Sequence, residues 1–333
     1  MGFAALYPSY LLLYHLSIRH DVAMLPNDPL PIDEALPGLT AALDAGTMAV
    51  LVAPPGAGKT TRVPLALLDA TWRKQGKIIV LEPRRLAARA AARRMAASLG
   101  EEVGETVGYR MRLDAKVSKR TRIEVVTEGV FTRTILSDPE LNGIAAVLFD
   151  EFHERSLDGD LGLALALDAT ALRDDLRLVV MSATIDGARV GGLMQGAPVI
   201  ESRGRAFPVE THYLARDPAL RLEDRVGGAV LAAMRADSGS VLVFLPGQAE
   251  ISRTAERLAG SLPSDTDLAP LYGQLSPAEQ DRAVQPAPAG RRKIVLATSI
   301  AETSLTIEGV RIVIDSGYRR VPAYEPATGL TRL

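Results

Sequence analysis

The sequence predicts an α/β protein made of two tandem doubly wound parallel-sheet domains. Short apolar runs alternate with helical stretches over most of the 333 residues, and this alternation is typical of a parallel sheet covered by helices. The alternation pauses in a proline-containing stretch, residues 196–217, and then starts again. The length leaves room for two domains of ordinary size.

The first series predicts buried parallel strands. Apolar runs without polar alternation are typical of strands that are covered on both faces. They occur at Met48–Ala53, Lys77–Leu81, Ile123–Val126, Ala145–Phe149 and Leu178–Met181. Helices are expected between them, for instance over Arg85–Leu99 and Leu157–Leu172.

A second series begins near Arg221. It predicts a helix over Arg225–Arg235 and strands over Ser240–Leu245, Lys293–Ala297 and Val310–Ile314. Because the prolines gather between the two series, we place the domains at residues 25–205 and 206–333.

Residues 1–24 differ in composition from the rest. The run Phe3–Ile18 is rich in Leu and Tyr, is interrupted by Pro8 and His15, and is shorter than the roughly 20 residues that a membrane span needs. It lacks the basic region and the small-residue cleavage site of a signal peptide. We expect a non-native or unstructured extension, with Met24 the true start. A membrane-associating helix is the alternative.

Composition excludes several kinds of site. The sequence has no cysteine, which rules out disulfides, thiolate nucleophiles and cysteine-ligated zinc, and its four histidines are scattered. A net charge of −2 gives no overall positive field, so contacts with nucleic acid must come from local arginine clusters. We expect a cytoplasmic protein that does not associate with membranes, although composition alone suits a metabolic enzyme equally.

A glycine-rich loop follows the first apolar run and has the pattern of a phosphate-binding loop. Glycines let backbone N–H groups turn inward around an anion, and the next helix adds its dipole. Lys59 is expected to reach the β and γ phosphates of ATP, and the Thr60 hydroxyl to ligate Mg²⁺. The competing interpretation is a glycine-rich turn that precedes a helix by chance. The sequence departs from the usual pattern at one position, where Ala53 replaces the first glycine. The expected nucleotide-binding residues are Ala53, Pro54, Pro55, Gly56, Ala57, Gly58, Lys59, Thr60 and Thr61.

An acidic pair ends the apolar run Ala145–Phe149. Side chains at the carboxyl end of a parallel strand emerge where α/β sheets bind ligands. Asp150 is therefore expected to hold Mg²⁺, and Glu151 to orient and deprotonate the attacking water. An acidic strand end by itself is as often a solvated cap as a catalytic site. The phosphate loop earlier in the chain favours a hydrolytic site.

The run Asp150-Glu151-Phe152-His153 resembles the DEAH box of superfamily 2 helicases. Further short motifs lie in the order of that family: Pro83-Arg84-Arg85, Thr127-Glu128-Gly129, Ser182-Ala183-Thr184, Phe244-Leu245-Pro246-Gly247 and Ala297–Ile307. Each tripeptide alone is weak evidence, but the ordered series is specific. The resemblance covers nearly all of Pro31–Leu333 and is closest to the bacterial HrpB-type helicases.

The resemblance implies two RecA-like domains and an ATP-dependent RNA helicase that uses ATP and Mg²⁺ to move along single-stranded nucleic acid. The implied catalytic residues are Lys59, Asp150, Glu151 and His153. Ser182 and Thr184 would couple the ATP state to strand binding. The sugar–phosphate backbone would be bound by Arg84, Arg85, Thr127, Gly129, Thr298 and Thr303, and the adenine would stack between Arg94 and Tyr318. From charge pattern alone these arginines suit a solvated helix face, and the two stacking residues suit an ordinary surface.

The motif VI of the family, a Gln-Arg…Gly-Arg-Gly-Arg run that supplies arginine fingers, does not occur in the sequence. An arginine finger contributes about 10³–10⁵ to the rate of phosphoryl transfer. We therefore expect an incomplete second domain and a chain that binds ATP better than it hydrolyses it. The rival function is a non-catalytic fragment that binds ATP and nucleic acid. A small-molecule P-loop kinase is disfavoured because it leaves the run Ala297–Ile307 and the second domain unexplained.

Overall fold

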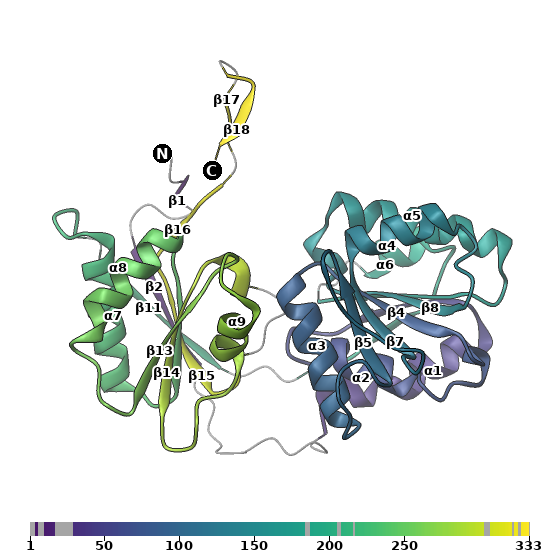
Figure 1. Ribbon diagram of the computed structural model, residues 1–333, viewed down its shortest axis with the longest axis horizontal. Helices are drawn as coiled ribbons and strands as arrows, with labels where there is room; N and C mark the ends of the chain where they lie inside the picture. The colour runs from purple at the N-terminus through teal and green to yellow at the C-terminus, as the bar shows by residue number, and fades with distance from the viewer. Residues whose placement is uncertain are drawn as a thin grey trace. The chain divides into compact units, whose positions relative to one another are not determined.

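The computed structural model describes residues 4–5, 10–16, 29–183, 187–204, 208–215, 217–302, 307–321, 323–325 and 328–332. The chain divides into two compact units (Figure 1). The N-terminal unit is Val22–Arg205, and the C-terminal unit is Ala206–Leu333 together with Met1–Asp21. Each unit contains a largely parallel sheet with helices packed on it, which confirms the predicted fold class.

The sheet of the N-terminal unit has the strand order β10-β3-β9-β8-β4-β7-β5-β6. Neighbouring strands are parallel except for the hairpin formed by β5 and β6. The strands are β3 (Met48–Val52), β4 (Lys77–Glu82), β5 (Val107–Met111), β6 (Asp114–Lys116), β7 (Ile123–Thr127), β8 (Ile144–Phe149), β9 (Arg177–Ser182) and β10 (Val199–Glu201).

Helices cover both faces of this sheet, as the apolar strands require. Leu39, Val63 and Met95, from three helices, pack on one face, and Phe131, Leu163 and Val190 pack on the other. The first face carries α1 (Leu36–Ala45), α2 (Lys59–Ala66) and α3 (Arg85–Ser98), and the second carries α4 (Glu128–Ser137), α5 (Leu157–Leu172) and α6 (Gly187–Leu193). Short 3-10 turns are η1 (Pro31–Glu34), η2 (Thr71–Arg73) and η3 (Phe152–Glu154).

The C-terminal unit has a sheet in the order β11-β2-β15-β12-β14-β13, and β15, β12, β14 and β13 run parallel. Val226 and Ile251, from two helices, pack on the strand residues Val243 and Ile294. The strands are β11 (Val209–Ala215), β12 (Ser240–Phe244), β13 (Thr266–Leu271), β14 (Arg292–Ala297), β15 (Val310–Asp315), β16 (Tyr318–Arg319), β17 (Ala323–Glu325) and β18 (Leu330–Arg332), and the helices are α7 (Leu222–Ala236), α8 (Gln248–Ala259), α9 (Pro277–Val284) and the turn η4 (Ser299–Ala301).

The N-terminal segment contributes strands to the C-terminal unit. The strand β2 (Tyr10–Leu16) lies between β11 and β15 and is antiparallel to both, and β1 (Ala4–Ala5) pairs with β16. This differs from the expectation that residues 1–24 lie outside both domains. Tyrosine is enriched in strands, and the edge of the parallel sheet at β15 offers backbone groups with which this segment pairs.

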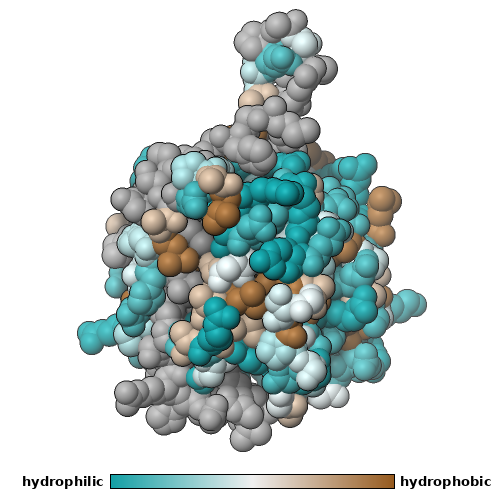
Figure 2. All heavy atoms as spheres, turned by 90° about the vertical axis from the view of Figure 1, so that its left-hand side faces the viewer, coloured by the Kyte–Doolittle hydropathy of each residue, from teal (hydrophilic) through white to brown (hydrophobic). Residues whose placement is uncertain are grey.

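The described surface shows neither a membrane-spanning element nor, on the face drawn in Figure 2, an extended apolar region. Over the described part of the chain, every helix is too short or too polar to cross a bilayer. On the face in Figure 2 the residues with defined placement are mostly hydrophilic, and hydrophobic residues stand in small separate groups. Scattered apolar residues of this kind are ordinary on a folded domain.

Candidate nucleotide-binding and hydrolysis site

The phosphate loop connects β3 to α2 in the N-terminal unit. Its glycines Gly56 and Gly58 have φ angles of 75° and 98°, a region that favours glycine. A Cβ added to Gly58 would lie 2.6 Å from the Leu30 Cδ1, so the segment before α1 packs directly behind the loop. Gly58 is also the N-cap residue of α2, which directs the backbone amides of the helix start toward the loop.

Lys59 is buried at the first position of α2 and spans the loop. Its ammonium group donates hydrogen bonds to the carbonyl oxygens of Ala53 at 2.8 Å and Pro54 at 3.3 Å. The backbone N–H of Ala53 in turn donates to the carbonyl of Ser182 at 3.0 Å. The loop is therefore joined to the end of β9. Ala53, which replaces the usual first glycine of the loop, is fully buried.

Asp150 follows β8 and has a buried side chain, of which 3% is exposed. One carboxylate oxygen, Oδ1, accepts the backbone N–H of Glu151 at 2.8 Å. Burial and the neighbouring Glu151 charge raise the pKa of Asp150 to about 6, against the lowering effects of the Thr60 hydroxyl and the Lys59 ammonium. Asp150 therefore lies close to Lys59 and Thr60, the first two residues of α2.

The other carboxylate oxygen of Asp150, Oδ2, is suited to a cation. It is buried and has no hydrogen-bond partner among the described residues. Mg²⁺ takes oxygen ligands and commonly uses one or two protein groups together with water and phosphate. Asp150 and Thr60 supply two such oxygens. The described residues contain no group of three or more His, Cys, Asp or Glu side chains arranged for a metal.

Glu151 is held in an unusual backbone conformation. Its φ angle is 48°, and it is the N-cap residue of the turn η3. This region costs a residue with a side chain roughly 1–2 kcal/mol, and such strain is concentrated at functional sites. Burial raises the pKa of Glu151, Lys59 opposes that shift, and Glu154 reinforces it. A partly desolvated carboxylate near Lys59 is a suitable general base.

His153 connects the acidic pair to the end of β9. Its Nδ1 lies 3.3 Å from the Glu151 Oε2 and 3.3 Å from the backbone N of Ala183. Burial and Lys59 lower the pKa of His153, so the imidazole is neutral near pH 7. In that state Nδ1 accepts the Ala183 N–H, and the contact with Glu151 is not an ion pair. Ser182 is buried beside it, and Thr184 lies outside the described residues.

The predicted strand-binding residues of the N-terminal unit share one edge of the sheet. Glu82 is paired with Thr127 in the register of β4 and β7, which places Arg84 and Thr127 at neighbouring strand ends. The exposed Arg85 donates to the carbonyl of Arg112 at 3.5 Å. At Gly129 an added Cβ would meet only the Asp158 Oδ2, at 3.6 Å. Packing within the unit therefore does not require glycine there.

The predicted residues of the C-terminal unit are only partly described. Thr298 follows β14, is half-buried, and donates its backbone N–H to the carbonyl of Leu271 at 3.2 Å. Thr303 lies outside the described residues. Tyr318 is half-buried in β16, whereas Arg94 is half-buried on α3 in the other unit. Stacking of adenine between them therefore stays a proposal.

Comparison with known proteins places these motifs in a family. Residues 35–190 match the family model described as DEAD/DEAH box helicase, and residues 226–326 match that of the helicase conserved C-terminal domain. The chain is a member of the DEAD/DEAH box helicase family. The helicase motifs predicted from the sequence thus belong to a recognised pair of helicase domains.

The relatives of this helicase chain are longer. It is 55% identical over 305 residues to the ATP-dependent RNA helicase HrpB of Escherichia coli K12, covering 91% of this chain and 38% of that protein. A crystal structure of the Escherichia coli DEAH/RHA helicase HrpB matches with a TM-score of 0.81 at 52% identity, over 91% of this chain and 39% of that one. A crystal structure of the E. coli DExH-box NTPase HrpB has a TM-score of 0.72 at 51% identity, over 93% and 38%.

Two contacts of the helicase site were not anticipated from the sequence. Glu154, directly after the DEAH-type box, pairs with Arg84 at 3.3 Å. Ser156, the N-cap of α5, donates to the Glu128 carboxylate at 2.6 Å and so joins α5 to α4. Glu154 and Ser156 follow His153 closely in the sequence and could have been noted as polar residues near the motif. Their partners could not be predicted, because Arg84 and Glu128 are distant in the sequence.

Asp150→Asn is expected to stabilise the chain in the absence of Mg²⁺. The folded-state pKa of about 6 exceeds the ordinary value of 3.8, so the charge destabilises the fold above about pH 6, and this cost disappears as the pH falls toward 4. The variant should gain about 1–2 kcal/mol near neutral pH and nothing near pH 4. Urea unfolding in EDTA at both pH values measures this, with the exposed Asp168→Asn as control. A destabilised variant at neutral pH would contradict the burial argument.

Proposed function

We propose that the chain couples ATP hydrolysis to movement along, and unwinding of, single-stranded RNA. The observation that carries this proposal is the placement of Asp150 and Glu151 against Lys59 and Thr60 at one edge of one sheet. A relative that is 55% identical bears the name ATP-dependent RNA helicase. The chain spans 38% of that relative, so its substrate and activity are proposed here and are not taken over from the relative.

The hydrolytic step follows from the chain's own side chains. The loop amides and Lys59 bind the β and γ phosphates. Asp150 and Thr60 would hold Mg²⁺, which supplies neutralisation of phosphate charge. Glu151 orients the attacking water and accepts its proton. The buried surroundings exclude bulk water and strengthen these electrostatic contacts.

Coupling to the strand follows from the links around the DEAH-type box. His153 accepts a hydrogen bond from Ala183, and Ser182 binds the phosphate loop through its carbonyl. A change at the γ phosphate therefore reaches the end of β9 and, through the turn η3, the arginines after β4. Because those arginines bind the sugar–phosphate backbone, we expect little base preference.

The test is RNA-stimulated ATP hydrolysis by the 333-residue chain. Turnover should rise with oligo(U) and not with oligo(dT), and a duplex with a 3′ single-stranded tail should be unwound. Binding of an ATP analogue and of RNA without turnover would instead support the non-catalytic alternative. Loss of both binding activities would refute the proposal.

Arg85→Gln is expected to weaken RNA binding uniformly across sequences. One fewer phosphate contact should lower the slope of log affinity against log salt by about 0.7 for a single strand. Fluorescence anisotropy with oligo(U) and oligo(A) at several salt concentrations measures both effects. The matched control is Arg133→Gln, an exposed arginine on α4 outside the motifs. Equal losses in the two variants would remove Arg85 from the RNA contact.

A further inference from the structure

An ion pair joins Arg84, the second residue after β4, to the turn η3 after β8. The Arg84 Nε lies 3.3 Å from the Glu154 Oε2, and the exposed fractions of the two side chains are 26% and 17%. The residues are 70 positions apart in the sequence, so this contact is purely tertiary. Partly desolvated pairs of this kind are held more firmly than surface ion pairs.

Glu154 belongs to the turn that presents the hydrolytic residues. It is the last residue of η3, and its backbone N–H donates to the carbonyl of Glu151 at 2.9 Å. Two residues of this segment, Glu151 and Arg155, have positive φ angles of 48° and 47°. A backbone in this region persists only when surrounding contacts hold it, and the pair with Arg84 is one such contact.

Arg84 is accessible to a second kind of anion. It is the N-cap residue of α3, at the sheet edge where Thr127 also lies, and about a quarter of its side chain is exposed. A guanidinium group binds carboxylate and phosphate with the same planar donor geometry. The Glu154 carboxylate accepts from the Arg84 Nε, so a phosphodiester that reaches Arg84 competes with this carboxylate for the charge of one guanidinium group.

We propose that Glu154 is a positioning residue that competes with RNA phosphate for Arg84 and thereby couples strand binding to the geometry of the hydrolytic turn. The inference rests on the proposed function, because it takes Arg84 as an RNA contact. When phosphate occupies Arg84, the turn loses one support and Glu151 moves relative to the phosphate loop. By linkage, RNA and nucleotide then alter each other's affinity by the same factor.

The experiment compares the full chain with Glu154→Gln, Arg84→Gln and the double variant. The affinity for oligo(U) is measured by anisotropy, with and without a saturating non-hydrolysable ATP analogue. Glu154→Gln should bind oligo(U) about threefold to tenfold more tightly, because the competing charge is removed. Arg84→Gln should bind more weakly, and adding Glu154→Gln to it should change nothing further. The factor by which the analogue alters RNA affinity should move toward one in Glu154→Gln.

The controls separate this inference from the proposed function. Glu102→Gln removes an exposed carboxylate elsewhere on the same unit and should leave both affinities unchanged, and thermal unfolding shows that each variant is folded. Unchanged RNA affinity and unchanged coupling in Glu154→Gln, with weakened binding in Arg84→Gln, would overturn the inference and leave the proposed function standing. Failure of the parent chain to bind RNA would overturn both, whereas full RNA affinity in Arg84→Gln would overturn the inference alone.

Discussion

Glu151→Gln is expected to lower the rate of ATP hydrolysis by about 10²–10⁴ while leaving ATP and RNA binding in place. The amide keeps the size of the carboxylate and the backbone turn, but it cannot accept a proton from the attacking water. Burial raises the pKa of Glu151 while Lys59 opposes this shift, which gives the carboxylate more basicity than an exposed one has. The effect should therefore fall on the chemical step.

Single-turnover hydrolysis, with chain in excess over radiolabelled ATP, measures that step even where steady-state turnover is slow. Nucleotide affinity is measured separately with a fluorescent ATP analogue. Asp168→Asn, an exposed carboxylate on α5, serves as the control and should hydrolyse ATP at the parent rate. Parent-like hydrolysis by Glu151→Gln would remove this residue from the role of general base.

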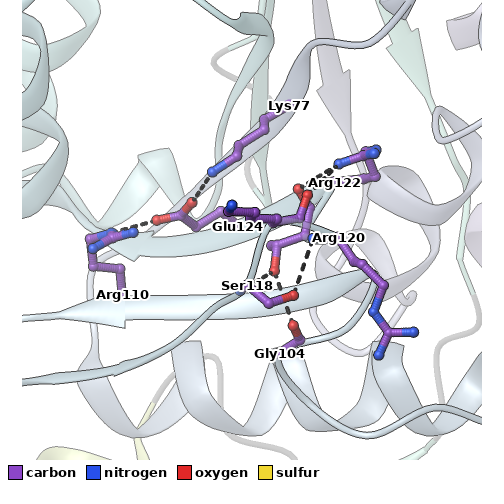
Figure 3. A network of polar contacts seen from close by, with 9 residues as sticks. Lys77, Gly104, Arg110, Ser118, Arg120, Arg122 and Glu124 are labelled. Atoms are coloured by element: carbon purple, nitrogen blue, oxygen red, sulfur yellow. Dashed lines mark hydrogen bonds and ion pairs between the residues drawn. The ribbon is translucent and has the colours of Figure 1, made fainter.

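Glu124→Ala is expected to lower the free energy of unfolding by about 2–4 kcal/mol. The Glu124 carboxylate is buried between the Lys77 Nζ at 3.0 Å and the Arg110 Nε at 2.6 Å (Figure 3). The three residues come from the adjacent strands β4, β7 and β5, so the carboxylate joins the edge hairpin to the sheet. Its removal leaves two neighbouring cations without their shared anion. The estimate is kept moderate because both cations are partly exposed.

Urea unfolding of the chain measures this loss. The matched control is Glu105→Ala, whose partner Arg120 is 71% exposed and lies 3.0 Å away. An exposed pair of this kind contributes about 0–1 kcal/mol, so the control should differ little from the parent. Equal losses in the free energy of unfolding for the two substitutions would show that the burial of Glu124 does not strengthen its ion pairs.

The strands and helices that the sequence predicts are those with a strong local pattern. The helix over Leu157–Leu172 is observed with the same bounds, and the run Lys77–Leu81 extends by one residue. The strand β5 was not anticipated, because Arg110 interrupts its apolar pattern. That arginine is accommodated by Glu124 on the neighbouring strand, a tertiary contact that no local window contains.

In the candidate site, too, contiguous motifs can be predicted from the sequence, whereas contacts between distant residues cannot. Gly58 and Lys59 form a short contiguous motif within a single turn, and they lie at the N-cap and the first position of α2. The part played by Glu154 depends on Arg84, 70 positions earlier, and is visible only when β4 and β8 are side by side. Sequence motifs identify the candidate nucleotide-binding groups, whereas the contacts between those groups depend on the fold.

The position of β2 has a consequence for the order in which the chain assembles during synthesis. The strand spans Tyr10–Leu16, but its neighbours begin only at Val209 and Val310. Chains fold from the N-terminus as they leave the ribosome, and pairing between distant segments is slow. The backbone groups of β2 therefore have no partner strand in the sheet until β11 and β15 have been synthesised, after the whole N-terminal unit.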